Sequence, residues 1–290
     1  MMTLLLGALL LFSHSVLHSK KPASHIPFYR ITKAGSADTS YLFGTLHLLE
    51  ASYVDTMPRV MHALGGADMV VGELEMDSVA HGFTIQSLMA QTPLDSVLTP
   101  SQFELVTKAV EKYSPVPIMM LNLAEPVVVY TIVMEGMYEQ AHPENHKTGV
   151  PMDLYFQQYA KNHGKRVMGL EEASDQAQAL DSIPQDEQVL SLMELVRDPK
   201  GAVKELNKML AEYRAGKISE ILDDPEFGSL SPDDMKSLLT VRNQKWLAEL
   251  PKILDSHRAF IAVGAGHLAG KVGLVEGLKK LGYKVEAVKS

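Results

Sequence analysis

The sequence predicts an α/β fold with a central mixed β-sheet flanked by helices and a largely helical middle section. Three observations support this prediction. Short apolar runs of strand length occur towards both ends of the chain, and stretches with helical spacing follow them. Two of these runs end in the same Gly-x-x-His pattern, and two others end in glutamate. Residues 84–138 and 185–258 show helical spacing interrupted by prolines, with a predicted loop from Pro225 to Pro232 in the second stretch.

The two Gly-x-x-His patterns each follow a predicted buried strand. The run Tyr41–Phe43 leads into Gly44-Thr45-Leu46-His47, and the run Phe260–Val263 leads into Gly264-Ala265-Gly266-His267. Ligands of open α/β sheets bind at the carboxyl ends of the strands. We therefore expect these two strands to lie side by side or one apart, so that His47 and His267 share a site. The alternative for either histidine is an ordinary hydrogen-bonded turn residue, because the bare pattern also occurs by chance.

Two further predicted strands end in carboxylates. The run Asp68–Glu75 has an apolar core and ends in Glu73 and Glu75, which share a face if the strand continues through them. The run Lys165–Leu170 leads directly into Glu171. Each strand is therefore predicted to deliver a glutamate at its carboxyl end. For Glu73 and Glu75 the alternative is a pair of solvated carboxylates at the edge of the sheet.

The remaining segments are predicted to be helices, one loop and a last strand. Pro126–Met137 is apolar nearly all round but only 12 residues long, which fits a core helix better than a membrane span. His142 and His146 are four residues apart, but Pro143 disfavours the helix on which they could share a metal, so residues 142–147 are predicted to be a loop. The other predicted helices are Pro58–Leu64, Asp153–Asn162, Ala173–Leu180 and Lys271–Leu281, and the last strand is Tyr283–Val288.

Composition excludes several classes of function. The chain has 290 residues, which is ample for one large α/β domain, and no linker-like stretch divides it. Its formal net charge is -8 and basic residues are scattered, which argues against nucleic acid as a partner. It has no cysteine, so disulfides, thiolate metal sites and a cysteine nucleophile are excluded.

The N-terminus predicts export. Leu4–Phe12 is an apolar stretch of signal-peptide length, followed by small residues near a plausible cleavage site. Residues 1–19 are therefore predicted to be a signal peptide and residues 20–290 the mature domain. The alternative is a buried or anchoring N-terminal helix. The mature chain is expected to be periplasmic or secreted and to work in proximity to a membrane.

Several familiar catalytic motifs do not occur in the sequence. There is no His-Glu-x-x-His, no Gly-x-Ser-x-Gly and no P-loop. Gly264-x-Gly266-x-x-Ala269 fits a dinucleotide fingerprint, with Glu286 twenty residues beyond Gly266. However, His267 inside the turn would crowd a pyrophosphate, and a dinucleotide fold needs further βα units after this point.

The order and spacing of the motifs resemble the TraB/GumN family, which is related to the Tiki metalloproteases. The resemblance covers nearly the whole of residues 20–290. One departure is Lys217, where the family usually has an acidic residue. The resemblance rests on Phe43–His47, Ala67-Asp68 through Glu73 and Glu75, Asp153, Gly164-Lys165 through Gly169–Glu171, Gln176, Tyr213, Gly216, Arg242-Asn243, Val263–Leu268, Gly270 and Gly273-Leu274.

The resemblance implies a divalent metal held by both histidines and by glutamates from neighbouring strand ends. Manganese or cobalt is expected rather than zinc, and the implied activity is proteolysis of a peptide or protein substrate. The chemistry agrees, because such ligands suit these ions and a metal-bound water is acidic enough to attack an amide. In our hypothesis His47, His267 and either Glu73 or Glu171 bind the metal. The other glutamate is the general base and Arg242 stabilises the oxyanion, although an ordinary ion-paired arginine is the alternative for Arg242.

Two functions of other classes stay open at this point. The wider superfamily also resembles bacterial haem- or iron-binding lipoproteins, so the chain is alternatively a non-catalytic haem- or iron-binding protein outside the cytoplasm. The two glutamates favour catalysis, because a haem carrier needs only axial ligands and an apolar cleft. A lipobox cysteine is also missing. The third alternative is an exported binding domain without a metal.

Overall fold

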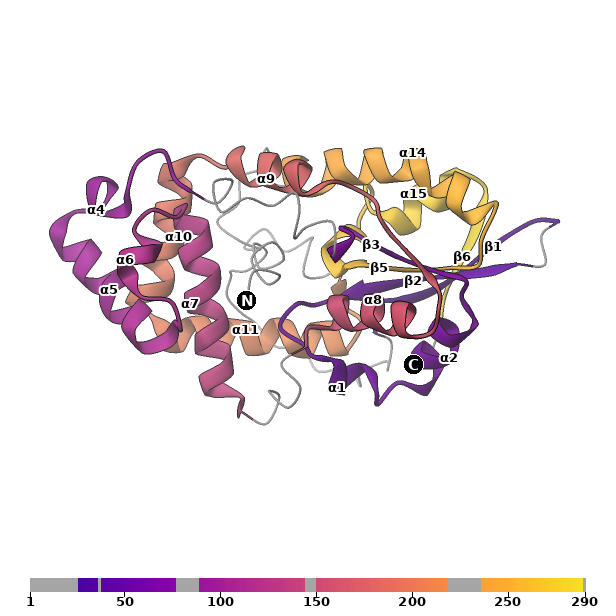
Figure 1. The fold of residues 1–290 in the computed structure, drawn as a ribbon, viewed down its shortest axis with the longest axis horizontal. Coiled ribbons are helices and arrows are strands. Elements are labelled where there is room, and N and C mark those ends of the chain that lie inside the picture. The colour runs from indigo at the N-terminus through magenta and orange to yellow at the C-terminus, as the bar shows by residue number, and fades with distance from the viewer. Residues whose placement is uncertain (1–25, 36–37, 77–88, 144–149, 219–235, 289–290) are drawn as a thin grey trace.

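The structure is a computed structural model that describes residues 26–35, 38–76, 89–143, 150–218 and 236–288. The predicted signal peptide, His146 and the predicted loop from Pro225 to Pro232 lie outside these residues. A β-sheet layered with helices occupies one half of the molecule, and a group of helices occupies the other half (Figure 1).

The sheet has six strands in the order β4-β3-β5-β2-β1-β6. Strands β4, β3, β5 and β2 are parallel, whereas β1 is antiparallel to both β2 and β6. The predicted mixed sheet is therefore confirmed. Strand β1 was not predicted, although its sequence FYRITK suits an extended conformation. The strands are β1 Phe28–Lys33, β2 Thr39–Thr45, β3 Met69–Gly72, β4 Arg166–Gly169, β5 Ala259–Gly264 and β6 Tyr283–Ala287.

Helices cover both faces of the sheet (Figure 1). Phe43 and Phe260 face a core that includes Phe156 of α8, while Leu42 and Ile261 face a second core that includes residues of α14 and α15. Because both faces are buried, the central strands are continuous apolar runs rather than alternating ones. This is why the short run at the start of β5 was recognisable in the sequence.

The helical half is built around α7, which is apolar on nearly all sides and confirms the predicted core helix. It contacts α5, α10 and α11. No helix of the described residues is both long and apolar enough to cross a bilayer. The α-helices are α1 Ala51–Val54, α2 Pro58–Gly66, α4 Leu94–Val97, α5 Pro100–Tyr113, α6 Ile118–Leu121, α7 Pro126–Ala141, α8 Met152–Asn162, α9 Ala173–Asp181, α10 Gln185–Arg197, α11 Pro199–Arg214, α14 Arg242–Leu254 and α15 Leu274–Lys280.

One element ends earlier than the sequence predicted. Strand β3 stops at Gly72, so Glu73 and Glu75 do not share the face of a strand. The cause is Gln157 of α8, whose amide donates to the Leu74 carbonyl at 2.7 Å and accepts from the Met76 N–H at 3.0 Å. These hydrogen bonds occupy the carbonyl of Leu74 and the N–H of Met76, which would pair with a neighbouring strand if β3 were longer.

Another element begins later. Helix α15 starts at Leu274 rather than Lys271, because Gly270 has a φ of 76° and Gly273 is the N-cap residue. A left-handed residue interrupts a helix, and glycine adopts that conformation without strain.

The close approach of α7 to the end of α5 gives a prediction for stability. A Cβ atom at Gly136 would overlap the carbonyl group of Tyr113. We expect Gly136→Ala to destabilise the protein by about 1 to 3 kcal/mol, because the two backbones must move apart. Denaturant unfolding measures this change. Gly66→Ala is the control, since nothing lies within 4 Å of its added Cβ, and an equal loss there would contradict the explanation.

Candidate functional site

Four parallel strands bring the predicted site residues to one edge of the sheet. Strands β4, β3, β5 and β2 are neighbours in that order, so their carboxyl ends share an edge. Glu171 follows β4, Glu73 follows β3, His267 follows β5 and His47 follows β2. The expectation that the two strands preceding the histidines lie side by side is confirmed by the parallel pairing of β2 with β5.

Arg242 connects three of these residues. It is the first residue of α14, directly after the π-helical segment η3 (Lys236–Val241). Its Nη2 donates to Glu73 Oε2 and to Glu171 Oε1, both at 2.6 Å, and its Nε lies 3.0 Å from Glu171 Oε2. Its Nη1 donates to the Leu238 carbonyl at 3.0 Å and lies 3.1 Å from His267 Nε2. Every N–H group of the guanidinium therefore has a partner.

Glu171 anchors Arg242. Its side chain has no exposed surface, and Trp246 Nε1 donates to its Oε2 at 3.1 Å. Burial raises the pKa of Glu171, and the hydrogen bonds from Arg242 act against that rise. Both carboxylate oxygens are engaged, and a forked arginine contact fixes the geometry of both partners. Glu171 is thus better placed to hold Arg242 than to bind a further ligand.

Glu73 is held by donors on both oxygens. Gly264 N–H donates to Oε1 at 2.7 Å, and Gln176 Nε2 donates to Oε2 at 3.1 Å beside Arg242. Burial alone would raise the pKa of Glu73, but the Arg242 charge, with smaller contributions from the two histidines and the Gly264 N–H, lowers it to about 2. A Cβ at position 264 would stand only 3.1 Å from Glu73 Oε1, so the glycine permits this close approach.

His267 is buried and its tautomer is fixed. It lies in the short 3-10 helix η4 (Ala265–His267). Asn243 Nδ2 donates to the carbonyls of His267 and Val272, so its Oδ1, 2.7 Å from His267 Nδ1, must accept the imidazole N–H. The Nε2 lone pair then faces Arg242 and lies 3.9 Å from Glu73 Oε1. Burial, partly opposed by Glu73, lowers the pKa of His267 to about 3, so the imidazole is neutral.

His47 is held by a carboxylate of its own. Its Nδ1 forms an ion pair at 2.8 Å with Asp153 Oδ2, near the start of α8. About a fifth of each of these two side chains is exposed, so solvent reaches this side of the site. Burial lowers the pKa of His47, but Asp153, Glu73 and Glu135 outweigh it and raise the value to about 9. His47 also affects the pKa values of Glu73 and His267, which shows that it belongs to the same electrostatic cluster.

Two residues beside this cluster have a buried oxygen atom without a hydrogen-bond partner. They are Thr45, at the end of β2, through Oγ1, and Gln176, which donates to Glu73, through Oε1. Buried polar atoms are normally paired, and exceptions mark sites where a water, an ion or a ligand binds. Within the described ranges, however, no three histidine, aspartate or glutamate side chains form a group that could hold a metal ion. Arg242 lies between the two predicted glutamate ligands instead.

The structure also shows site residues that the sequence did not single out. The centroids of the Trp246 and His267 rings are 4.3 Å apart, with the rings tilted by 41°, and the Arg242 guanidinium carbon lies 4.9 Å from the Trp246 ring centroid. Asn243 and Asp153 were part of the recognised motifs, but their roles in orienting the histidines were not predicted.

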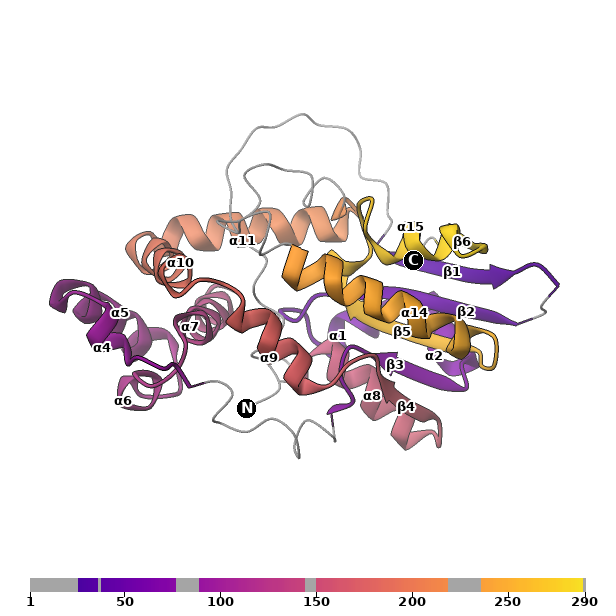
Figure 2. The ribbon, with the colours of Figure 1, turned by 90° about the horizontal axis from the view of Figure 1, so that it is seen from above.

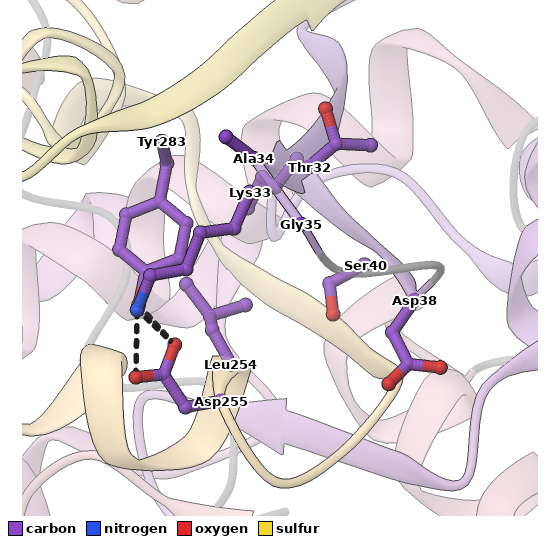
Figure 3. Close-up of a pocket in the computed structure, with 10 residues that line it drawn as sticks. Thr32, Lys33, Ala34, Gly35, Asp38, Ser40, Leu254, Asp255 and Tyr283 are labelled. Carbon is purple, nitrogen blue, oxygen red and sulfur yellow. Dashed lines mark hydrogen bonds and ion pairs between the residues drawn. The ribbon is translucent and has the colours of Figure 1, made fainter.

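A pocket lies at the opposite edge of the sheet, where β1 ends and β2 and β6 begin (Figure 3). Two of its charged groups pair with each other, because Lys33 Nζ donates to both oxygens of Asp255 at 2.7 and 2.8 Å, and Tyr283 donates to the same carboxylate. None of the predicted site residues lines it. This pocket is therefore not the site indicated by the sequence.

Comparison with known families gives a match over nearly the whole chain. Residues 27–287 match the model of the TraB/PrgY/gumN family. The resemblance drawn from the motifs is therefore confirmed. Comparisons with curated proteins and with solved structures gave no match.

Loss of the central cation should destabilise the fold. We expect Arg242→Met to cost about 3 to 5 kcal/mol of unfolding free energy, because it leaves the carboxylates of Glu73 and Glu171 in the interior without their cation. Urea titration of both proteins measures the difference. Arg30→Met is the matched control, since its pair with Glu286 is exposed and such pairs contribute about 1 kcal/mol or less. Equal losses in the two variants would show that the Arg242 cluster is not a stabilising centre.

Stability should also depend on pH through His267. Its folded pKa of about 3 lies below the ordinary value of 6.5, so the unfolded chain binds the proton first on acidification. The contribution of the neutral His267 to the free energy of unfolding is therefore fully present above about pH 6.5. It is lost as the pH falls towards about 3, by at most about 1.4 kcal/mol per pH unit. Melting curves recorded in chelator between about pH 7 and about pH 3 should show that stability falls less steeply with decreasing pH in His267→Gln than in the unmodified protein. The exposed His62→Gln should keep the slope of the unmodified protein, and an unchanged slope in both variants would rule out this assignment.

Proposed function

The chain belongs to the TraB/PrgY/gumN family, and from this membership and the geometry of the site we propose an exported, metal-dependent hydrolase that cleaves peptide bonds. The observation that carries the proposal is the 3.9 Å separation of His267 Nε2 and Glu73 Oε1. Two ligands at about 2.0 to 2.2 Å from one ion lie about 3 to 4 Å apart. The pair therefore has the spacing of two neighbouring metal ligands.

Three of the four predicted ligands offer a donor atom of the type that a metal binds, although within the described residues they do not form a group that could hold an ion. His47 and His267 both use Nδ1 for an oxygen partner, Asp153 and Asn243, which leaves Nε2 as the ligating atom. Such partners orient metal-binding histidines and increase their basicity. Glu73 supplies the carboxylate, whereas Glu171 does not fit, because Arg242 and Trp246 occupy its oxygens.

In the proposed reaction the side chains of the protein bind the ion, orient its ligands and exclude bulk water from the site. A divalent ion, manganese or cobalt rather than zinc, would supply a water molecule that is acidic near neutral pH. Glu73 stays ionised, because its pKa is about 2, and its Oε2 accepts a hydrogen bond from Arg242 Nη2. Trp246 lies against His267 and Arg242 and excludes water from that side.

Arg242 acts first as a positioning residue. All of its N–H groups have partners, so a developing oxyanion gains a hydrogen bond only if one partner is released. His267 Nε2 is the partner most easily released, because a ligand bound to this lone pair would free one Nη1–H. The oxyanion role predicted for Arg242 is compatible with the site under this condition.

The alternative of a haem carrier has less support. A haem site needs an apolar cavity beside its axial ligands. His267 is instead surrounded by Arg242, Glu73 and Asn243. The polar surroundings favour hydrolysis, and the predicted export signal favours a periplasmic or secreted substrate.

Metal binding and peptide cleavage test this proposal together. We expect the purified chain to bind one manganese or cobalt ion and to cleave members of a peptide library. A chelator should remove the ion and abolish the cleavage. His47→Ala and His267→Ala should each abolish stoichiometric metal binding while circular dichroism stays nearly unchanged, because each removes one ligand of a shared ion. His163→Ala, an exposed histidine at the end of α8, is the control. Full metal occupancy in both single variants would refute the shared site.

A further inference from the structure

A group of exposed apolar side chains lies at the end of the helical half that is farthest from the sheet. Among the described residues eight large apolar side chains are exposed, and four of them belong to this group. Met119 is 84% exposed and Met120 is 68% exposed. Exposed apolar residues that occur singly are normal, whereas a contiguous group marks a surface that binds a partner. We call this group the methionine tip, and its members are Met89, Met119, Met120 and Leu123.

The main chain holds the members of the methionine tip together. Helix α6 carries Met119 and Met120 and ends two residues before Leu123. The Ala90 N–H donates to the Leu123 carbonyl at 2.9 Å, which brings the segment that contains Met89 against the segment that follows α6. The four residues therefore form one patch, although they come from two separate parts of the chain.

The methionine tip is fixed to the fold from beneath. Leu121, on the same helical turn, is buried in the core of the helical half. The side chain of Asn122 accepts from the Asp95 N–H at 3.0 Å and donates to the Asp95 carboxylate at 3.1 Å. The turn is thus anchored on both sides of α6. The outward direction of Met119 and Met120 is therefore a property of the fold and not of a loose chain segment.

The composition of the methionine tip identifies the chemistry of its partner. Residues 113–124 contain no charged residue. Tryptophan, tyrosine and arginine provide most of the binding energy in protein interfaces, and none of the four members is of these types. Long, flexible apolar side chains instead suit the hydrocarbon of a lipid layer, into which a surface element of a protein is buried by its apolar face.

The position and the border of the methionine tip agree with a lipid partner. Helices α4, α5 and α6 form the outer end of the helical half in Figure 1 and again in Figure 2, so this end projects away from the sheet. Lys112 and Tyr113 end α5 directly before the uncharged segment, and Lys112 Nζ lies 4.7 Å from the centroid of the Tyr113 ring. Lysine and tyrosine are the side chains that place a polar tip at the level of the lipid headgroups.

We propose that the methionine tip is a membrane-docking surface, which inserts its four apolar side chains into the outer part of the hydrocarbon layer of a bilayer. The chain has a formal net charge of -8, so attraction to anionic headgroups does not drive this contact, and salt leaves it unchanged. The predicted export signal agrees with work beside a membrane. The proposal concerns the helical half alone and does not depend on the proposed hydrolase function.

Vesicle binding tests the proposal. We expect the full chain to co-sediment with phosphatidylcholine vesicles to the same extent in about 0.1 M and about 1 M NaCl. The double variant Met119→Ser, Met120→Ser should lower the partition coefficient by about 100-fold, because burial of each methionine contributes about 10-fold. Leu281→Ser is the matched control, since Leu281 is 47% exposed at the end of α15 on the sheet half, and it should bind as the unmodified protein does.

A tryptophan reporter locates the inserted surface even if residues 1–19 also anchor the chain. The protein has one tryptophan, Trp246, which is fully buried. Met120→Trp adds a second one at the methionine tip. Phospholipids with brominated acyl chains should quench the fluorescence of this variant, because bromine quenches only a tryptophan that lies among the acyl chains. The unmodified protein and Leu281→Trp should show no quenching.

Three results would overturn the proposal. The first is vesicle-bound Met120→Trp that is not quenched, or vesicle binding that the double serine variant retains in full. The second is binding that salt weakens equally in all variants, which would assign it to headgroup charge. The third is a dimer in light scattering that the double serine variant loses, together with no vesicle binding, which would assign the methionine tip to contact between two copies. None of these measurements uses a metal or a peptide substrate, so they leave the hydrolase proposal untouched.

Discussion

The contact of Arg242 with Glu73 and Glu171 is the interaction on which the rest of the site depends. Two carboxylates arrive from neighbouring strands, and without a cation their burial would be prohibitive. The guanidinium satisfies both and also reaches His267 Nε2. A lysine could not replace it, because one ammonium group lacks the planar fork that meets three partners in fixed directions. The arginine therefore fixes the relative positions of β3, β4 and the turn after β5.

The two halves of the molecule contribute to the site in different ways. The parallel strands deliver His47, His267, Glu73 and Glu171 to one edge, which is a property of the sheet topology. The helices set the orientation of these groups, since Asp153 of α8 holds His47 and Asn243 of α14 holds His267. Tyr213 of α11 donates to the Gly44 carbonyl at 2.6 Å and ties the helical half to the end of β2. The position of the first histidine thus depends on elements far from it in sequence.

Much of this arrangement could be predicted from the sequence, and the reasons for the failures are physical. The strand before each Gly-x-x-His pattern was predictable, because a strand buried on both faces is a continuous apolar run. Strand β1 was missed, since Tyr29 and Arg30 interrupt its apolar residues. The role of Glu171 was not predictable, because it depends on Arg242 and Trp246, which come from a helix some 70 residues further along the chain.

The balance of charge in the cluster explains why His47 is protonated. Arg242 pairs with Glu73 and Glu171, and Asp153 pairs with His47. Among these described residues the three carboxylates outnumber the one arginine, so an excess of negative charge remains for a proton to neutralise. This excess raises the pKa of His47 to about 9, while burial holds His267 neutral. A divalent ion bound between the two histidines would neutralise the same excess and would have to displace the proton of His47, because an imidazole ligates only when it is neutral. The carboxylates that favour a protonated His47 are therefore the ones that would favour a bound metal. The proton and the divalent ion would compete to neutralise the same negative charge.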